Sequence, residues 1–369
     1  MLTIDGRHGE GGGQILRTAL TLAALTGQPF TLTNIRAGRK TPGLAPQHLA
    51  TVRLLGQLCA AEMTGARLGS FDLTFVPQSA PLPGDYVLDV AQVAGQGSAG
   101  AVTLIAQAAL LPLAFAPGPS TLTLTGGTHV AWSPPAHYLS EVFLPLLAPL
   151  GLHVEVELRA WGFYPVGGGQ LHLRIPGGTP PLAPLTLTKR GPLTQVSGWG
   201  VAANLPADIA QRLSNRARNQ LADHGIRAEM TALRVKSAGA GAAVWLLAEY
   251  ANTRTGVIAI GAKGKPAHHV ADEAVSAWLA FHQSATPVDA HLADQLLLPL
   301  LFATGPSQFV TAEVTEHLRT NAATIDLFLP GRVRIGSEAT VSVIGQYSAS
   351  ARPSTGAACC RNADTRNTP

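Results

Sequence analysis

Segments typical of strands and of helices alternate along this 369-residue chain, and the alternation restarts twice. A short strand at 3–4 runs into a glycine-rich loop. A helix then extends from Gln14 to about Leu25, because its apolar side chains recur at helical spacing and Gly27 and Pro29 stop it. A strand, a helix and a strand complete this first passage, at 30–35, 46–60 and 71–76. Such alternation indicates a mixed α/β chain.

The same outline recurs twice more along the chain. The second passage places helices at 101–114 and 138–150, with strands at 120–125 and 153–158. The third passage runs through 272–283, 290–303, 309–314 and 322–327. The passages share an architecture but no sequence similarity at a fixed period. We therefore predict an α/β (α+β) protein whose large domain consists of repeated βαβαββ-type units.

The character of the chain changes between about 176 and 262. The Pro- and Gly-rich stretch 175–184 is typical of a linker. After it come three strand-like segments and one polar helix, at 194–202, 228–235, 243–250 and 207–224. We therefore predict a small α/β domain at 178–269, inserted into a large domain made of 1–177 and 270–347. Residues 348–369 are low in apolar side chains and are expected to form a disordered tail.

Composition excludes several classes of protein. Hydrophobic residues make up 46% of the chain and charged residues 13%, the opposite of a disordered composition. The longest apolar stretch, about 101–116, is interrupted by a glutamine and a proline and is too short to span a bilayer, so no membrane association is expected. Three cysteines, Cys59, Cys359 and Cys360, form neither a metal motif nor a disulfide framework. With no stretch typical of a signal peptide, this favours a cytoplasmic protein.

A glycine-rich loop at 9–14, Gly-Glu-Gly-Gly-Gly-Gln, lies between the first predicted strand and helix. Glycines let the backbone approach a ligand closely, and free N–H groups at a helix start favour phosphate. The loop is neither a Walker A motif nor a GxGxxG dinucleotide fingerprint. Glu10 is suited to holding a divalent ion beside phosphates. The motif alone leaves a tight turn with a solvated carboxylate as an equal alternative.

Three arginines follow this loop within 30 residues. Arg17 lies one helical turn beyond it, and Arg36 and Arg39 lie at a strand end, three residues apart with Gly38 between them. Guanidinium groups bind phosphate oxygens in a bidentate manner and keep their charge. This spacing favours phosphate binding over an exposed basic loop that binds nothing specific.

Several motifs in this order resemble those of the RNA 3′-terminal phosphate cyclases. They are the runs GEGGGQILR from Gly9, IRAGR from Ile35, PGLAPQHL from Pro42, WGFYPVGGG from Trp161, HLADQ from His291 and HLRTN from His317. The resemblance covers 5–334. It implies a large domain of repeated βαβαββ units with a small inserted domain, and an ATP-dependent conversion of an RNA 3′-phosphate to a 2′,3′-cyclic phosphate through a histidine–AMP intermediate and an RNA-adenylate.

The resemblance also implies roles for individual residues. His317 would be the nucleophile that becomes linked to AMP, and Glu10 would hold the divalent metal, Mg or Mn. Arg17, Arg36 and Arg39 would serve catalysis around the phosphates. The residues expected to bind ATP and RNA are Gln47, His48, Gln107, His291, Leu292, Ala293, Asp294 and Gln295. The implied partners are ATP and an RNA with a 3′-terminal phosphate, and no obligate protein partner is expected.

Imidazole suits this chemistry, because it is a good nucleophile near neutral pH and passes AMP onward. Two alternatives remain open from the sequence. A non-catalytic relative that acts in ribosome assembly would share the fold but lack the nucleophilic histidine and much of the arginine cluster. An enolpyruvyl transferase also repeats βαβαββ units, but its signature lysines are not recognisable here. The Tyr164–Pro165 turn before the glycines is expected to be structural.

Overall fold

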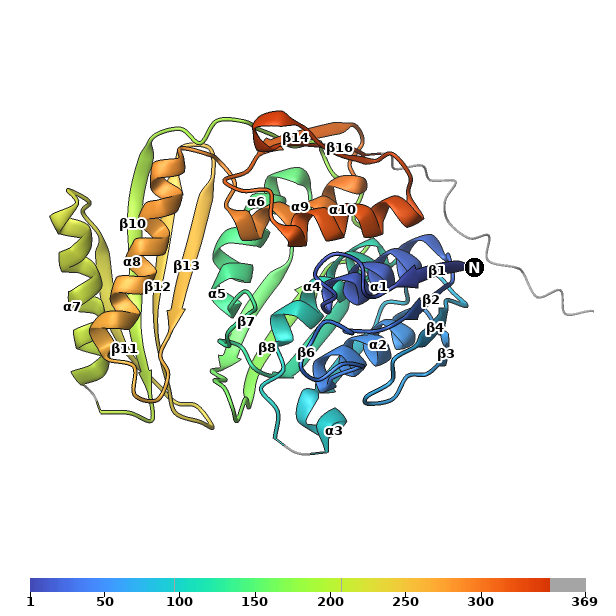
Figure 1. The fold of residues 1–369 in the computed structure, drawn as a ribbon, viewed down its shortest axis with the longest axis horizontal. Helices are drawn as coiled ribbons and strands as arrows, with labels where there is room; N and C mark the ends of the chain where they lie inside the picture. The colour runs from blue at the N-terminus through green and yellow to red at the C-terminus, as the bar shows by residue number, and fades with distance from the viewer. Residues whose placement is uncertain (96, 207, 346–369) are drawn as a thin grey trace, which may run out of the picture.

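The computed structural model describes residues 1–95, 97–206 and 208–345, and the predicted tail at 348–369 lies outside the described residues. Its strands form four sheets of four strands each. Figure 1 shows three of these sheets around a group of central helices, with the fourth sheet and two helices set to one side. No helix in the described part is long and apolar enough to cross a membrane.

The first unit spans the N-terminal 76 residues. Its elements are β1 (Leu2–Asp5), α1 (Gln14–Thr26), β2 (Phe30–Thr33), α2 (Pro46–Leu58), β3 (Glu62–Thr64) and β4 (Leu73–Val76). The sheet has the order β1-β2-β4-β3. β1 and β2 are parallel, and the other two pairs are antiparallel. Two neighbouring parallel strands need a crossover connection, and α1 is that connection between β1 and β2.

The second unit repeats this topology. Its elements are β5 (Asp85–Asp89), the short α3 (Val90–Ala94), α4 (Val102–Phe115), β6 (Ser120–Gly126), α5 (Ala136–Tyr138), η1 (Leu139–Phe143), α6 (Leu144–Leu147), η2 (Ala148–Leu150), β7 (Glu155–Ala160) and β8 (Gly169–Ile175). The order β5-β6-β8-β7 matches that of the first sheet strand for strand, including the single parallel pair. The helix predicted at 138–150 is present, but a π-helical turn and a 3₁₀ turn interrupt its α-helical hydrogen bonding.

The third unit begins before the insertion and ends after it. Its elements are β9 (Thr186–Leu187), α9 (Ala290–Leu301), β14 (Pro306–Val310), α10 (Glu316–Phe328), β15 (Val333–Ile335), the 3₁₀ turn η3 (Ser337–Ala339) and β16 (Thr340–Ile344). Its sheet, β15-β16-β14-β9, has the same order read from the other edge, and β9 and β14 are its parallel pair. The predicted repetition of βαβαββ units is therefore confirmed.

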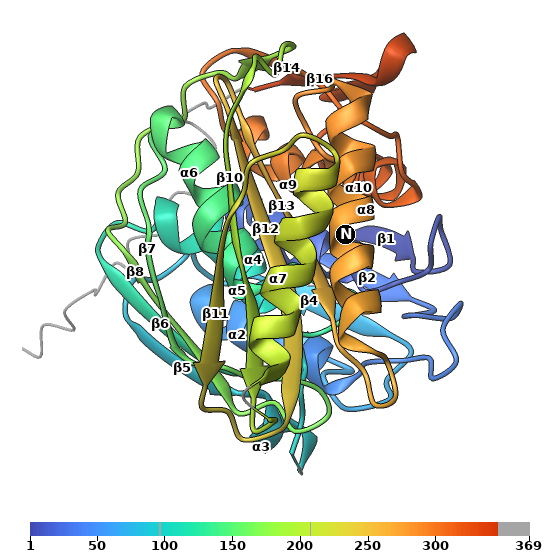
Figure 2. The ribbon, with the colours of Figure 1, turned by 90° about the vertical axis from the view of Figure 1, so that its left-hand side faces the viewer.

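The inserted part has a different topology. It contains β10 (Leu193–Ala203), α7 (Asp208–Asp223), β11 (Glu229–Val235), β12 (Gly241–Tyr250), β13 (Arg254–Ile260) and α8 (Ala267–Ser284). The sheet order is β11-β10-β12-β13. Figure 2 shows α7 and α8 side by side over one face of this sheet, where apolar residues of both helices form a second hydrophobic core.

This packing bears on the predicted domain bounds. The bounds 178–269 for the insert remain a prediction, yet β9 already pairs with β14 of the large domain. Val270, Ala274 and Trp278 of α8 pack in the core of the insert. The pairing and the packing favour an insert that starts near Leu193 and ends near Ser284.

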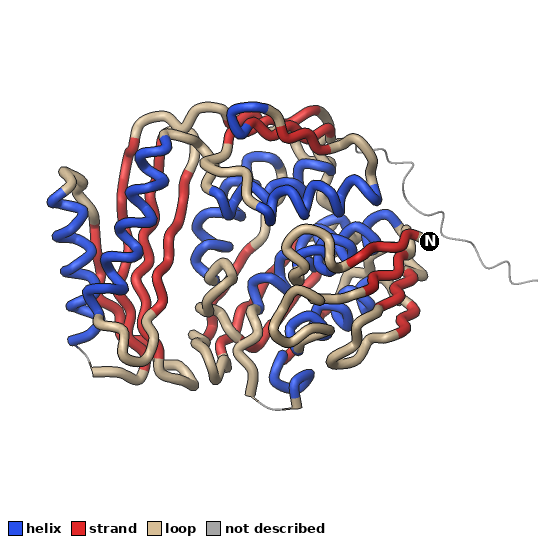
Figure 3. The backbone as a smooth tube through the Cα atoms, viewed as in Figure 1, coloured by secondary structure: helices blue, strands red, loops and turns tan. Residues whose placement is uncertain are grey.

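Helices from all three units meet at the centre of the large domain, as the tube drawing makes visible (Figure 3). α1 contacts α2, α4 and α10, and α10 contacts α9. Ten of the thirteen residues of α1 are buried, because apolar or small side chains such as Ala19 and Leu20 face these neighbours on every side. Gln14 at the start of α1 contacts Asp294 of α9 and His317 of α10, which brings together residues about 300 positions apart in the sequence.

Candidate active site

The glycine-rich loop before α1 is packed too closely for side chains. Gly9 has φ +57°, and a Cβ atom there would lie 2.0 Å from Thr320 Oγ1 in α10. A Cβ on Gly13 would lie 2.2 Å from His48 Nε2 and 2.9 Å from Arg17 Nη1. A Cβ on Gly12 would lie 2.8 Å from Arg39 Nη2. The glycines thus let three cationic or imidazole side chains and α10 approach one stretch of backbone.

Glu10 lies at the centre of this arrangement. One carboxylate oxygen contacts the Arg39 guanidinium, and the other lies 2.8 Å from His317 Nε2. Its backbone N–H donates to Thr320 Oγ1 at 3.4 Å. The predicted metal-holding residue and the predicted nucleophile are therefore in direct contact, although 307 positions separate them in the chain.

His317 is the second residue of α10. Thr315 caps this helix by accepting a hydrogen bond from Leu318 N at 3.1 Å, which fixes where the helix begins. The side chain of His317 is half exposed. Partial burial lowers its pKa, an effect that Asp294 opposes and that Arg17 reinforces. A lowered pKa favours the neutral imidazole, which is the nucleophilic form.

Gln14 is a site residue that the sequence analysis left without a role. Its Oε1 contacts His317 Nδ1, and its Nε2 donates to Asp294 Oδ2 at 2.6 Å. Asp294 is held in turn, because its carbonyl oxygen accepts from Asn321 Nδ2 at 2.8 Å. The only feature of the sequence that could have pointed to Gln14 as a site residue is its position directly after the glycines, at the first turn of the helix.

The three arginines gather around His48. Burial lowers the pKa of Arg17 to about 10, which leaves it charged at neutral pH. The pKa of His48 is well below its ordinary value, first through burial and then through Arg17, Arg36 and Arg39. His48 is therefore neutral, and its Nδ1 is buried without a hydrogen-bond partner among the described residues. The predicted convergence of the arginines agrees with these couplings.

Arg36 and Arg39 are held differently from each other. Arg36 adopts a left-handed backbone conformation, with φ +55°, and its Nη1 donates to the carbonyl oxygen of Gly43 at 2.9 Å. Arg39 is more exposed and contacts Glu10. One guanidinium is thus fixed to the backbone, while the other is paired with the carboxylate of Glu10.

The remaining predicted binding residues lie on α2, α4 and α9. Gln107 Nε2 donates to Gln295 Oε1 at 2.5 Å, and Gln295 Nε2 donates to the carbonyl oxygen of His291 at 2.6 Å. Gln47 Oε1 accepts from Ala101 N at 2.9 Å, at the start of α4. These bonds connect α9 of the third unit to α4 of the second, and α4 to α2 of the first.

Two members of the run 291–295 do not face the site. Leu292 and Ala293 are fully buried in the main hydrophobic core. Their side chains hold α9 in place, while His291 is exposed and Asp294 and Gln295 make the polar contacts. Their predicted part in binding stays a prediction, and it would have to involve their backbone or the position of the helix.

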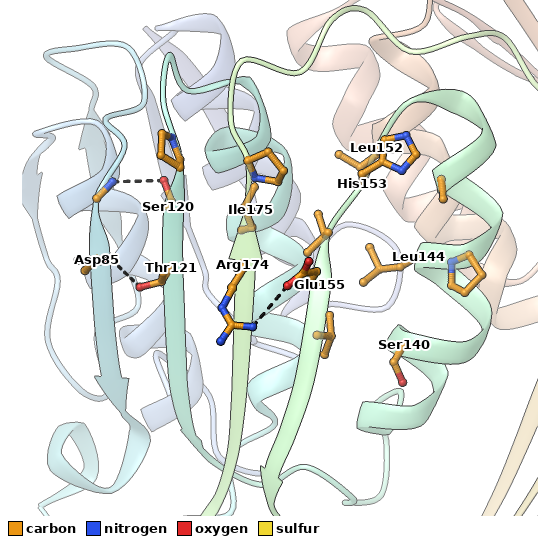
Figure 4. A pocket seen from close by; sticks show the side chains of 17 residues that line it. Asp85, Ser120, Thr121, Ser140, Leu144, Leu152, His153, Glu155, Arg174 and Ile175 are labelled. Carbon is orange, nitrogen blue, oxygen red and sulfur yellow. Dashed lines mark hydrogen bonds and ion pairs between the residues drawn. The ribbon is translucent and has the colours of Figure 1, made fainter.

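A cavity in the second unit lies away from this cluster. It has a volume of about 940 Å³ and is lined by β5, β6, β7, β8 and the helical segment that carries Ser140 and Leu144. In Figure 4, Arg174 and Glu155 are paired with each other at its wall. None of the predicted site residues lines it. The chemistry-bearing side chains instead converge at the start of α1.

Comparison with known proteins agrees with this convergence. The family model described as RNA 3′-terminal phosphate cyclase matches residues 8–335, which include the glycine loop, the arginines and His317. The chain belongs to the RNA 3′-terminal phosphate cyclase family. The match begins after β1 and ends before β16, so it covers the second unit, the insert and most of the first and third units.

Curated members of the cyclase family resemble the chain over nearly its whole length. An RNA 3′-terminal phosphate cyclase of Nostoc sp. is 48% identical over 344 residues, which cover 93% of this chain and 99% of that protein. The cyclase of Methylococcus capsulatus is 48% identical over 335 residues, covering 91% and 93%. The cyclase of Archaeoglobus fulgidus is 40% identical over 334 residues, covering 89% and 96%.

A solved structure of the enolpyruvyl transferase NikO from Streptomyces tendae matches 48% of this chain and 33% of its own, with a TM-score of 0.26 and 18% identity. A likeness this weak assigns neither fold nor function.

Proposed function

We propose that this protein is an ATP-dependent RNA 3′-phosphate cyclase that works through an adenylate on His317. The observation that carries the proposal is the position of the His317 imidazole. It is half exposed, oriented by Gln14, and next to Glu10 and the glycine loop. Enzymes that transfer nucleotidyl groups need positioning and neutralised phosphate oxygens, and a nucleophile beside an anion-binding loop meets both needs.

The proposed reaction has three displacements. A ring nitrogen of His317 attacks the α-phosphate of ATP, a P–N bond forms, and pyrophosphate leaves. The RNA 3′-phosphate then attacks the same phosphorus, which forms the RNA-adenylate and returns the free imidazole. Finally the neighbouring 2′-OH attacks the activated 3′-phosphate, loses its proton, and releases AMP. The product is a 2′,3′-cyclic phosphate.

In this proposal the three arginines bind the phosphate groups. Arg17 is buried behind the loop, Arg36 is anchored to the Gly43 carbonyl, and Arg39 lies over Gly12. The neutral His48 lies among them and can donate a hydrogen bond to a phosphate oxygen without adding charge. Three guanidiniums around an open backbone loop provide the charge neutralisation that a triphosphate requires.

A divalent ion, Mg or Mn, fits the residues at Glu10. Mg²⁺ is commonly held by one or two carboxylates together with substrate phosphates and water. Within the described residues no group of three or more potential ligands is preformed, so substrate phosphates would complete the coordination. When bound, the ion would neutralise phosphate oxygens. Glu10 would then release Arg39 and His317 for substrate.

Adenosine would lie toward α4 and α9. Gln107 and Gln295 present amide groups that can donate to and accept from an adenine edge, and exposed His291 offers a ring for stacking. Asp294 Oδ2 accepts from Gln14 Nε2, which leaves Oδ1 as the carboxylate atom for the adenosine contact that the resemblance implies.

The decisive experiment is incubation of the protein with ATP and Mg²⁺ or Mn²⁺, followed by intact mass analysis. The expected result is a mass increase of one AMP that is lost in acid and kept in base, as a phosphoramidate requires. His317→Ala should form no adduct while keeping its circular dichroism spectrum. A non-catalytic relative or an enolpyruvyl transferase would take up no label from α-labelled ATP. Absence of label in the wild-type protein, or an undiminished adduct in His317→Ala, would refute the proposal.

A further inference from the structure

Trp132 lies fully exposed on the loop between β6 and α5. The chain has five tryptophans, and the other four all contact further aromatic rings: Trp161, Trp199, Trp245 and Trp278. The Trp132 ring has no aromatic or hydrogen-bond partner among the described residues. An indole left in water forgoes the stabilisation that burial of its large apolar surface provides. Its exposure therefore points to a partner outside the chain.

The backbone holds this ring in a strained but fixed place. Trp132 has φ +65°, a left-handed conformation that is rare for a residue with a bulky side chain. Ser133 Oγ donates to the carbonyl oxygen of Val130 at 3.1 Å, and the prolines at 134 and 135 restrict the chain that follows. Strained residues of this kind cluster at ligand sites, where the surrounding structure maintains them.

The loop is attached to the start of α4, which also carries part of the candidate active site. Thr103 Oγ1 donates to the carbonyl oxygen of Pro134 at 2.6 Å. Gln107, one of the predicted binding residues, lies four positions after Thr103 and so on the same face of α4. The backbone N–H just before α4 donates to Gln47 Oε1 at 2.9 Å. The loop thus adjoins residues that are proposed to bind the substrates.

The repeated architecture gives this loop two counterparts. In each unit one loop leads from the second strand of the parallel pair to the helix that follows, and these loops span 34–45, 127–135 and 311–315. The first carries Arg36 and Arg39, and the third leads directly to His317. Arg36 also has a positive φ, +55°. By its place in the repeat, the second loop is expected to contribute a side chain to the same substrates, and Trp132 is the one it exposes.

The surroundings of Trp132 suit a polyanion with aromatic bases. The segments 126–140 and 161–169 contain no aspartate or glutamate. They adjoin each other, because the backbone N–H of His129 donates to the carbonyl oxygen of Gly162 at 3.0 Å. Tyr164, in the second segment, is also largely exposed. Exposed rings on loops without carboxylates are the surfaces on which the bases of single-stranded nucleic acids stack.

We propose that Trp132 stacks on a base near the 3′ end of the substrate RNA and thereby contributes to RNA affinity. The proposal rests on the proposed function, because it takes an RNA 3′-phosphate as the ligand of the neighbouring site. Every base has a π-face, so the contact would tolerate all four bases. The adenine of ATP is the competing partner. The second exposed ring at Tyr164 favours a strand of several bases over a single nucleotide.

Equilibrium binding tests this contact without ATP or metal. The probe is a fluorescein-labelled single-stranded RNA with a 3′-phosphate, followed by anisotropy. In Trp132→Ala the Kd should rise about tenfold or more, and Trp132→Phe, which keeps a ring, should recover most of the affinity. Val87→Ala removes another exposed apolar side chain, on β5, and is the control. Equal Kd values for the wild type and Trp132→Ala would overturn the proposal.

Two further readouts distinguish stacking from a structural or ionic role. The urea midpoint and the slope of log Kd against log salt should be the same in Trp132→Ala as in the wild type, because neither a buried contact nor a charge is removed. A lower midpoint or a shallower slope would count against stacking. With 2-aminopurine placed in turn at each of the last few RNA positions, the quenching on binding should weaken at one position in Trp132→Ala. Undiminished quenching at every position would contradict the proposal.

Adenylation with ATP and metal alone distinguishes RNA from adenine as the partner. In the absence of RNA, the KM for ATP in adduct formation should be the same in Trp132→Ala and in the wild type. A KM raised about tenfold together with an unchanged Kd for RNA would mean that Trp132 stacks on adenine, and would overturn the proposal. If the wild-type protein forms no adduct, the proposed function fails, while the RNA-binding measurements still decide the part of Trp132.

Discussion

Thr18 and Asn321 lie 303 positions apart, and their side chains share a hydrogen bond of 2.7 Å in the buried seam between α1 and α10. Asn321 also donates to the carbonyl oxygen of Asp294 at 2.8 Å. Both ends of its amide are therefore used, and the bonds join the first unit to the third directly behind the candidate active site. Thr18 is buried, with 3% of its surface exposed.

Replacing Thr18 by Val should destabilise the protein. The change removes the only donor to Asn321 Oδ1 among the described residues and leaves that oxygen buried, which costs about 1–3 kcal/mol. Urea unfolding would measure the loss. Thr18→Ser keeps the hydroxyl and serves as the matched control. Equal stability of the two variants would show that the hydrogen bond contributes nothing.

Arg36 and Arg39 should both be intolerant of lysine if they bind phosphate as proposed. Lysine keeps the charge but loses the bidentate geometry, and at Arg36 it also loses the hydrogen bond from Nη1 to the Gly43 carbonyl. Cyclisation should fall well over tenfold in each variant, about 1.4 kcal/mol of barrier or more. Arg67→Lys, at an exposed arginine, is the control. Near wild-type cyclisation rates in both site variants would show that these two positions contribute only positive charge and no specific phosphate contact.

An RNA 3′-phosphate whose terminal sugar lacks the 2′-OH should be adenylated and then stall. Transfer of AMP concerns only the phosphate, whereas the last step needs the adjacent 2′ oxygen held nearly in line. The RNA-adenylate should accumulate on a gel or in a mass spectrum, and a 3′-hydroxyl end should give no cyclic product. Efficient release of AMP from the deoxy end without that intermediate would indicate hydrolysis and contradict a cyclase.

Acid should destabilise the fold through a buried histidine pair. His129 Nε2 and His137 Nδ1 are 2.9 Å apart, and burial lowers the pKa of His137 to about 4. Below the ordinary histidine pKa of about 6.5, the unfolded chain binds more protons than the folded protein. The free energy of unfolding therefore falls as the pH drops from about 6.5 toward 4. Above about pH 6.5 this contribution does not change with pH. The loss at His137 should be about 2 kcal/mol between neutral pH and about pH 5.

Chemical unfolding at a series of pH values would measure this loss. His137→Gln should flatten the slope, and His153→Gln, at an exposed histidine, should not. An unchanged slope in His137→Gln would mean that other groups cause the acid sensitivity.

The sequence by itself determined the repeated unit and the local pieces of the site. Helical periodicity and the stops at Gly27 and Pro29 placed α1 within a residue or two of its observed end. The motif order identified the family, and with it Glu10, the arginines and His317. These features are local, because a helix or a glycine loop is encoded by neighbours in the chain.

The tertiary structure decided what those pieces contact. That the two-residue strand β9 pairs with β14 across an insertion of about 100 residues is invisible to local patterns. α8 reads as a helix of the large domain, yet its apolar face completes the core of the insert. Leu292 and Ala293 belong to a binding motif in sequence but to the hydrophobic core in space.

Gln14 is the clearest example of a site residue that only the tertiary structure reveals. Its residue type carries no catalytic signal, and its importance comes only from the two partners that the fold delivers, Asp294 and His317. Those contacts span 280 and 303 positions of the chain. These contacts need both partners in place, so the sequence could name His317 as the predicted nucleophile, while only the packing of α1 against α9 and α10 could position Gln14 beside it.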